Sequence, residues 1–516
     1  MGWLVFLGAL LVLSVTPARA DMEAAKAAYE RGEFEFAFRE FMTHGEAGNA
    51  EAQRYLGAMS EAGRGVPQNL SEAAKWYLKA ATQGNTDAQV AMGNLHVLGK
   101  GVPRNDAKAV YWYRKAAQKG GERVHLTLGL MYSLGQGVPR NDTEAAKWLR
   151  KAADLGNVDA QLLLARMHAE GQGVAKDDVR AARWYQKAAE QGNSDAQFLL
   201  GLMYVKGQGV SRSGVQASKW LRKAAEQGSS NAQLLLALMH AEGQGVRKNR
   251  NESLNLLRKA ADEANPHAQC ILGDIYYSGK GVAKDFGAAL KWYQAAARQG
   301  HANAQMLLGQ MYAFGEGVQQ DYAEAAKWFL KAAEQGNGDA QLLLGLMYAS
   351  GDGVPQDDAR AIEWTRQAAE KGYLDAQLLL GQMYSSGRGV PQDPAEAVKW
   401  TRQAAEQGCA GAQNNLGYAY AQGQGVSMDH EEAVKWYRQA AEQGNAIARH
   451  NLGLAYAKGD GVPQDPVLAI MWFTLAANQG DAESAKMRDE LAGSVSPPDV
   501  ARAGEMARDW KPKPRQ

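Results

Sequence analysis

Apolar and polar residues follow one another with the period of an amphipathic helix, and this pattern returns every 36 residues along the chain. In one unit, Ala340, Leu344, Met347 and Tyr348 are spaced at i, i+4, i+7 and i+8, which places them on one face of a helix. Ten of the twelve units have glycine at the position of Gly345, and the other two have alanine. Because glycine costs a helix about 1 kcal/mol, we expect a neighbouring helix to pack closely against this position.

A second apolar stripe in the same unit, with Ala361, Trp364 and Ala368, predicts a second helix after a short turn. Glycines in that turn end the first helix, as they do at C-terminal caps. In seven units Glu or Gln follows the predicted N-cap by three residues and predicts a capping box, as with Asp393 and Glu396. The N-caps predicted for the second helices are Asn69, Asn105, Asn141, Asp177, Ser213, Asn249, Asp285, Asp321, Asp357, Asp393, Asp429 and Asp465.

Self-similarity at this period is typical of repeat proteins. The twelve units follow without an insertion or deletion, and each has a Gly-x-Gly-Val turn. The pattern predicts an all-α protein, an α-solenoid in the form of a right-handed superhelix of about twelve 36-residue helix-turn-helix repeats. The second helix carries tryptophan in every unit except the sixth, which has Leu256, and we interpret this column as core rather than as a ligand cage.

These residues resemble the Sel-1-like repeat, a branch of the tetratricopeptide-repeat superfamily, over roughly residues 34–481. The motif is complete in the unit that contains Ala304, Leu308-Gly309, Tyr312, Gly315-Glu316-Gly317-Val318, Ala325, Trp328-Phe329, Lys331-Ala332-Ala333 and Gly336. The resemblance implies a scaffold or adaptor whose partner differs between members, with the first helices lining a concave groove. The repeat style resembles bacterial exported members most.

Four segments are predicted along the chain. Residues 1–20 have a short apolar core and a small-x-small sequence ending at Ala20, which predicts a cleavable signal peptide, with an uncleaved anchor as the alternative. Residues 21–50 form a partial, capping repeat, and residues 51–481 form the repeat solenoid. Residues 482–516 supply capping helices and a short tail. The mature chain is therefore expected in the periplasm or secreted, without an integral membrane segment.

Net charge and cysteine content exclude some kinds of partner and of covalent cross-link. The formal charge of +1 excludes a globally basic nucleic-acid binder. The two cysteines, Cys270 and Cys409, lie nearly four repeats apart, so we expect free thiols. With only two cysteines, the chain also differs from the cysteine-rich members of the family.

Catalytic and metal motifs are missing from the sequence. It has no Gly-x-Ser-x-Gly, Ser-x-x-Lys, His-Glu-x-x-His or Cys-x-x-Cys. His96, His168 and His240 stand where most repeats have tyrosine, and they lie two repeats apart from one another. We interpret them as rings that replace tyrosine in packing, and we predict no catalytic residue, metal or cofactor.

Function is expected where the repeats differ. The position after the first-helix glycine and the position four residues later vary freely, which predicts a surface that faces a protein partner, or in part padding of the inter-repeat core. The predicted partner-binding residues are Leu130, Arg166, Glu170, Leu202, Lys206, Leu238, Asp274, Gln310, Phe314 and Tyr418.

A second column of residues precedes the second-helix N-caps. In six consecutive repeats it holds a cation, which predicts a basic stripe along one edge, either a site for an anionic polymer or lipid surface, or solvated charge. The stripe consists of Arg104, Arg140, Lys176, Arg212, Lys248 and Lys284.

Three functional hypotheses follow from this pattern. The first is a non-catalytic protein–protein interaction scaffold in the bacterial envelope, with a partner in envelope assembly or peptidoglycan machinery. The second is a binder of anionic polysaccharide or surface lipid through the basic stripe. The third, a β-lactam hydrolase, rests only on what has been suggested for cysteine-rich relatives, and the missing Ser-x-x-Lys argues against it.

Overall fold

The computed structural model describes residues 21–511, and within this range the chain forms α-helices and no strands. The helices alternate in pairs, as the 36-residue pattern predicts. The first helices of the twelve repeats are α3 Ala50–Ala62, α5 Thr86–Leu98, α7 Glu122–Leu134, α9 Val158–Glu170, α11 Ser194–Lys206, α13 Ser230–Glu242, α15 Pro266–Ser278, α17 Ala302–Phe314, α19 Gly338–Ser350, α21 Leu374–Ser386, α23 Ala410–Gln422 and α25 Ala446–Lys458. The second helices are α4 Leu70–Thr82, α6 Asp106–Ala116, α8 Asp142–Asp154, α10 Asp178–Glu190, α12 Gly214–Glu226, α14 Arg250–Asp262, α16 Phe286–Arg298, α18 Tyr322–Glu334, α20 Asp358–Glu370, α22 Pro394–Glu406, α24 His430–Glu442 and α26 Pro466–Ala477.

Close packing of the two helices of a repeat explains the glycine inside the first helix. A Cβ added at Gly345 would lie 2.5 Å from Oγ1 of Thr365, a residue of the second helix of the same repeat. At Gly57 the same Cβ would meet the ring of Tyr77 at 2.6 Å. The expectation of a close neighbour is therefore confirmed, and the neighbour belongs to the same repeat.

The turn between the helices requires two glycines for different reasons. Gly351 ends α19 in the left-handed region, at φ 83°, and its N–H donates to the carbonyl of Met347. Gly353, at φ 71°, lies against the first residue of the second helix of the preceding repeat. A Cβ there would come within 2.2 Å of the carbonyl carbon and oxygen of Tyr322. The second glycine therefore allows one repeat to approach the next.

The N-caps of all twelve second helices are confirmed. In each, the side chain of the predicted residue accepts a hydrogen bond from a backbone N–H of the first turn, as Asp357 does from Arg360 at 3.0 Å. Five of the six predicted capping-box glutamates pair with a lysine instead. Glu396 accepts from Lys399, one turn further on, at 2.9 Å. Four more repeats have the same pair, Glu72–Lys75, Glu144–Lys147, Glu324–Lys327 and Glu432–Lys435.

Buried glutamines connect successive repeats. Gln161 lies near the start of α9, and its amide donates to the carbonyl of Ala153 at the end of α8 at 3.1 Å. Its side-chain oxygen accepts from Gln191, at the end of the next second helix, at 2.8 Å. The bond to the carbonyl eight residues earlier is shared by Gln53, Gln89, Gln161, Gln197, Gln233, Gln269, Gln305, Gln341, Gln377 and Gln413. These glutamines give a second hydrogen bond to carbonyls in the last turn of the preceding helix, most of which also accept from the backbone N–H three residues later, as Ala153 does from Gly156 at 3.1 Å.

Additional helices flank the repeats. Before the first complete repeat, α1 Met22–Arg31 and α2 Phe34–Glu46 bury Ala28, Ala37 and Phe41 in one cluster with residues of the first repeat. After the last repeat come α27 Ala482–Ala492 and α28 Pro497–Asp509. Trp510 packs edge-on against Trp472 at 5.9 Å, which covers the apolar side of the last repeat. The predicted signal peptide, residues 1–20, and the end of the tail lie outside the described residues.

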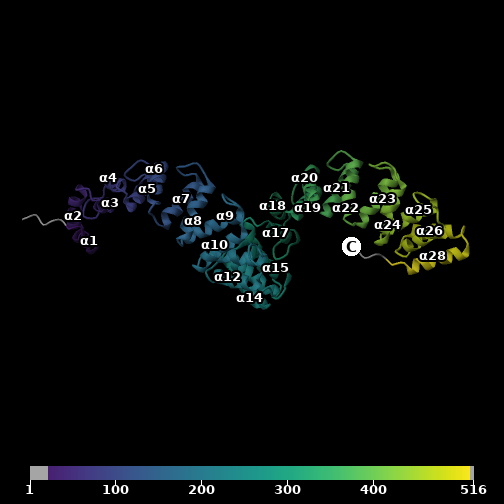
Figure 1. Cartoon of the computed structure of the whole chain (residues 1–516). Helices are drawn as coiled ribbons and strands as arrows, with labels where there is room; N and C mark the ends of the chain where they lie inside the picture. The colour runs from purple at the N-terminus through teal and green to yellow at the C-terminus, as the bar shows by residue number, and fades with distance from the viewer. Residues whose placement is uncertain (1–20, 512–516) are drawn as a thin grey trace, which may run out of the picture. The chain divides into compact units, whose positions relative to one another are not determined.

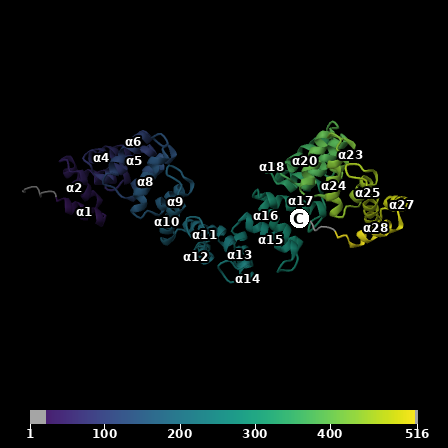
Figure 2. The same ribbon diagram turned by 45° about the vertical axis from the view of Figure 1, so that its right-hand side comes forward.

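The helices form two compact units, one ending at Leu256 and the other starting at Leu257. Within each unit, successive helices lie next to one another in chain order (Figures 1 and 2). None of the helices in residues 21–511 has the length and apolar character that crossing a membrane would require.

Candidate functional site

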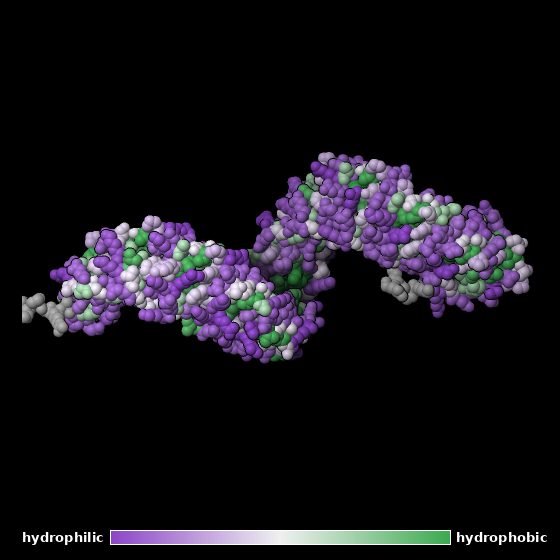
Figure 3. Space-filling model, turned by 45° about the horizontal axis from the view of Figure 1, so that its top comes forward, coloured by the Kyte–Doolittle hydropathy of each residue, from purple (hydrophilic) through white to green (hydrophobic). Residues whose placement is uncertain are grey.

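The variable positions of the first helices form the candidate site, which we call the first-helix face. It consists of the residue after the helix glycine or alanine and the residue four positions later in each repeat. Side chains at the later position are exposed in all twelve repeats, at Ala62, Leu98, Leu134, Glu170, Lys206, Glu242, Ser278, Phe314, Ser350, Ser386, Gln422 and Lys458. On the side of the molecule seen in Figure 3, the surface is mainly hydrophilic and hydrophobic groups occur as separate patches.

The apolar residues predicted on this face divide into two groups. Leu130, Leu238, Phe314 and Tyr418 are exposed, and Phe314 has 69% of its surface accessible. Leu202 is half-buried instead. In that repeat the side chain therefore packs partly in the core between repeats, which was the alternative prediction. An apolar side chain exposed to water is available as an anchor for a partner.

The polar residues predicted on this face mostly have partners within the chain. Arg166 pairs with Glu170 at 3.5 Å, Lys206 is exposed, and Gln310 is half-buried. Such exposed pairs contribute little to stability and can exchange for a partner's charges.

Asp274 differs from the other polar residues of the face. The residue is exposed overall, but its carboxylate accepts a hydrogen bond from the Tyr293 hydroxyl at 2.7 Å. Burial of the carboxyl group raises the pKa of Asp274, and the bond from Tyr293 acts in the opposite direction. Asp274 therefore serves to hold Tyr293, and its carboxylate is less available to a partner than the sequence indicated.

A pocket of about 580 Å³ opens beside two positions of the first-helix face, Gln382 and Tyr418. Its walls come from α21, α22 and α23, and include Leu378, Thr401 and Asn415. The walls mix apolar side chains with hydroxyl and amide groups, as is typical of sites that bind a ligand or a partner's side chain.

The small residue Thr401 explains why the pocket forms here. In the repeat that follows, the ring of Tyr437 covers the helix glycine, and a Cβ at Gly417 would lie 2.8 Å from it. At Gly381 the corresponding neighbour is the short side chain of Thr401, at 3.1 Å. The pocket was not predicted from the sequence. The available signal was threonine in two successive repeats, at Thr365 and Thr401, where the other ten have tyrosine, phenylalanine or leucine.

The six cations of the predicted basic stripe are all exposed. Arg104 pairs with Asp106 at 3.4 Å and Arg140 with Asp142 at 2.9 Å, so two of the charges are partly neutralised by the first residue of the following helix. Lys284 lies over the ring of Phe286 at 4.3 Å. Where the stripe position holds glutamine, the amide has a structural role. Gln68, Gln320, Gln356, Gln392 and Gln464 each donate to a carbonyl at the end of the preceding helix.

The histidine and tryptophan columns belong to the core, as predicted. His96, His168 and His240 are buried, and the Nδ1 atoms of His96 and His240 lie 3.3 Å from the carbonyl oxygen seven residues later. Trp76 is buried with Lys79 above its ring at 4.0 Å. Residues 21–511 contain no group of three or more His, Cys, Asp or Glu side chains able to hold a metal ion. Cys270 and Cys409, both within this range, are free thiols.

Paired antiparallel helices in tandem, joined by glycine turns and a glutamine ladder, define the protein as an α-solenoid repeat protein. The Sel1 repeat family model matches residues 50–85, 86–121, 127–157, 158–193, 194–229, 230–265, 266–301, 302–337, 338–373, 374–409, 410–445 and 446–481. The chain therefore belongs to the Sel1-repeat family. Proteins of this family generally mediate protein–protein interactions.

The solved structures to which the chain is similar include two from bacteria. One is a protective antigen with an SLR fold from uropathogenic Escherichia coli, 34% identical, with 92% of this chain and 94% of that chain covered and a TM-score of 0.58. The other is a Sel1 repeat protein from Oxalobacter formigenes, 36% identical, with 60% of this chain and 89% of that chain covered and a TM-score of 0.53. None of the curated proteins compared with the chain matches it.

Proposed function

We propose that the protein is a non-catalytic scaffold that binds a protein partner through the first-helix face. The observation that carries the proposal is a surface position that is exposed in all twelve repeats and yet free of any packing rule. Residues that serve only the fold recur in each repeat, as the N-caps and the turn glycines do. Residues that vary on an exposed face are available for specificity.

The pocket beside Gln382 and Tyr418 is the anchoring point in the second unit. An apolar side chain of the partner enters it, while the side-chain amide of Asn415 meets polar atoms at its rim. Binding energy concentrates where a side chain fills a pocket and is removed from water. Phe314, on the same face of the same unit, makes the reverse contact: here an apolar side chain of this protein inserts into the partner.

Export is part of the proposal. Residues 1–20 act as a cleaved signal peptide, and the mature chain works in the periplasm or after secretion. The partner then belongs to the cell envelope, with envelope assembly or peptidoglycan machinery as the setting. Export is supported by the sequence of the first twenty residues, and the bacterial setting by the bacterial sources of the two similar structures.

Filling the pocket tests the proposal. Thr401→Tyr places over Gly381 the kind of ring that Tyr437 places over Gly417, so the fold tolerates it and the cavity is lost. Thr401→Val keeps the side-chain volume and serves as the matched control. The full chain and both variants are used for affinity capture from an envelope extract.

We expect one protein to be retained by the wild type and by Thr401→Val, and to be lost or strongly reduced with Thr401→Tyr. Equal retention by all three chains would remove the pocket from the interface. A protein that is lost from all three chains in high salt, whatever the residue at position 401, would favour the basic stripe instead.

A further inference from the structure

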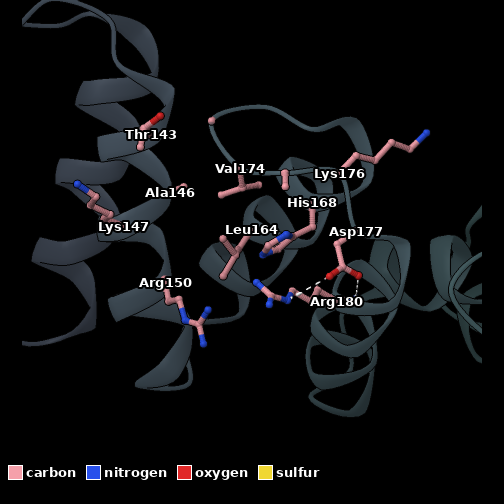
Figure 4. A pocket seen from close by; sticks show the side chains of 12 residues that line it. Thr143, Ala146, Lys147, Arg150, Leu164, His168, Val174, Lys176, Asp177 and Arg180 are labelled. Carbon is pink, nitrogen blue, oxygen red and sulfur yellow. Dashed lines mark hydrogen bonds and ion pairs between the residues drawn. The ribbon is translucent and has the colours of Figure 1, made fainter.

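A second cavity, of about 390 Å³, lies in the first unit among α8, α9 and α10. Arg150 reaches it from α8, Leu164 and His168 from α9, and Arg180 from α10 (Figure 4). The imidazole of His168 points into the space between α8 and α10, and the two arginine side chains extend on the same side of it (Figure 4). The cavity is separate from the first-helix face, and the proposed function does not use it.

Comparison of the repeats explains why this cavity exists. Eight repeats have tyrosine at the position of His168, and in five of them an arginine in one of two flanking positions donates to the tyrosine hydroxyl. Arg150 occupies the first flanking position, 18 residues before the ring, and Arg180 the second, 12 residues after it. The observed arginine-to-hydroxyl bonds are Arg258–Tyr276 at 3.1 Å, Arg366–Tyr384 at 2.6 Å, Arg402–Tyr420 at 2.7 Å and Arg438–Tyr456 at 2.9 Å for the first position, and Arg360–Tyr348 at 3.1 Å for the second.

The repeat of His168 is the only one of the twelve with arginine in both flanking positions. It is also one of three repeats in which histidine removes the hydroxyl. Two guanidinium groups therefore face a ring that has no oxygen to accept their hydrogen bonds. The missing phenol leaves both the space and the unused donors.

The charge of the cavity walls comes mainly from two arginines. Arg150 and Arg180 line it against the single carboxylate of Asp177, while Lys147 and Lys176 contribute their aliphatic stems and point their ammonium groups away from it (Figure 4). Asp177 caps α10 and also pairs with Arg180 at 3.1 Å. At the outer edge, Arg150 approaches Asp154 at 3.7 Å and Lys147 pairs with Glu144 at 2.6 Å. These contacts hold the side chains but leave several guanidinium N–H groups for a ligand.

His168 contributes a neutral polar group at the base of the cavity. The residue is 3% exposed, and its Nδ1 atom lacks a hydrogen-bond partner within the described chain. Burial lowers the pKa of His168, and the charges of Arg180 and Arg150 lower it further. The carbonyl of Ala175 is near enough to act in the opposite direction. A neutral imidazole beside two guanidinium groups adds a polar contact without adding another buried charge.

We propose that this cavity binds a small organic anion, with its carboxylate or phosphate group between Arg150 and Arg180 and its apolar part against Leu164 and Val174. The planar guanidinium group matches the geometry of these oxyanions and bonds them with two parallel N–H donors. The apolar wall favours an anion with a hydrocarbon portion over a free inorganic ion.

Calorimetric titration of the full chain tests the proposal with four probes: benzoate, phenyl phosphate, inorganic phosphate and the neutral benzamide. His168→Tyr is the informative variant, because it restores the ring and hydroxyl that eight other repeats have and is expected to fold. Arg150→Gln removes one donor and introduces the residue found at position 186. His96→Tyr is the matched control, since Leu78 and Lys108 occupy its flanking positions.

We expect benzoate or phenyl phosphate to bind with one site per chain, and benzamide not to bind. His168→Tyr and Arg150→Gln should each weaken binding by about tenfold or more, because a charge-assisted hydrogen bond is lost. The control should bind as the wild type does. The proposal is overturned if neither organic anion binds, if benzamide binds equally, or if His168→Tyr leaves the affinity unchanged. Inorganic phosphate binding as tightly as phenyl phosphate would contradict the role of the apolar wall.

Discussion

The second glycine of each turn shows how one residue determines the spacing of whole repeats. Gly353 has φ 71° and lies against the backbone at Tyr322, which begins the second helix of the preceding repeat. A side chain here would be strained in its own backbone and would also push two repeats apart. Gly372, which ends the second helix of the same repeat at φ 89°, has no atom within 4 Å of where its Cβ would be.

These two glycines give a matched pair of variants. Gly353→Ala should lower the free energy of unfolding by about 3 kcal/mol or more, because the left-handed conformation and the backbone clash both oppose it. Gly372→Ala should cost only about 1 kcal/mol, from the conformation alone. Urea denaturation followed by circular dichroism measures both. Equal losses would mean that the contact with Tyr322 relaxes without cost.

His168 makes stability depend on pH in a predictable direction. Its pKa in the folded chain lies below the ordinary value of 6.5, first because the ring is buried. The unfolded chain therefore takes up a proton on this ring at a higher pH than the folded chain does. The contribution of the neutral ring to stability is complete above about pH 6.5 and is lost as the pH falls from there toward the lower pKa of the folded chain. We expect the melting temperature of the wild type to fall more than that of His168→Tyr between about pH 7.5 and about pH 5. Equal falls in melting temperature for the two chains would contradict the lowered pKa of His168.

At the scale of the elements, the helix ends were predictable and the contacts between repeats were not. Asp357 and its equivalents were identified because a cap acts within one turn of its own helix. Glu396 was assigned to a capping box, but the structure pairs it with Lys399, since both arrangements fit the same spacing. Gln377 was overlooked because its partners, Ala369 and Gln407, lie in neighbouring second helices and no local pattern connects them.

The glutamine ladder should contribute measurably to stability. Gln377→Met keeps the side-chain length and removes the bond to the Ala369 carbonyl, which then accepts only from Gly372. It also takes away the oxygen that accepts from the Gln407 amide. We expect the free energy of unfolding to fall by about 1–3 kcal/mol. Gln422→Met, on an exposed position of α23, is the control and should stay within about 0.5 kcal/mol of the wild type. Similar values for both variants would show that the ladder adds little.

At the scale of the whole molecule, the repeat period predicted the architecture, and the departures from it locate the candidate sites. Each cavity is lined by a residue that is smaller than the one most repeats have at its position, Thr401 in one unit and His168 in the other. Sequence spacing identified the variable positions of the first helices. It could not show that Leu202 is half-buried or that Asp274 holds Tyr293, because both facts depend on the neighbouring second helix.

The basic stripe is a second case in which sequence spacing predicted exposure but not the contacts of the side chains. Its cations are exposed as the spacing indicated, but Arg104 and Arg140 form ion pairs with carboxylates two residues away, which lowers the net positive charge of the stripe there. Nothing in the repeat pattern requires an acidic residue there, since Arg212 is followed by Gly214 at the corresponding position. The first-helix face therefore remains the stronger candidate for the main partner.

The most direct test compares two double variants in affinity capture from an envelope extract. The residues substituted in the two variants are similarly exposed. Leu134→Glu with Phe314→Glu alters the first-helix face at residues that are 66% and 69% exposed. Val215→Glu with Met428→Glu alters residues outside this face that are 64% and 65% exposed. Circular dichroism first establishes that both variants fold. We predict that the wild type and the second variant retain a common partner and that the first variant loses it. Retention by both variants, or loss from both, would contradict binding through the first-helix face.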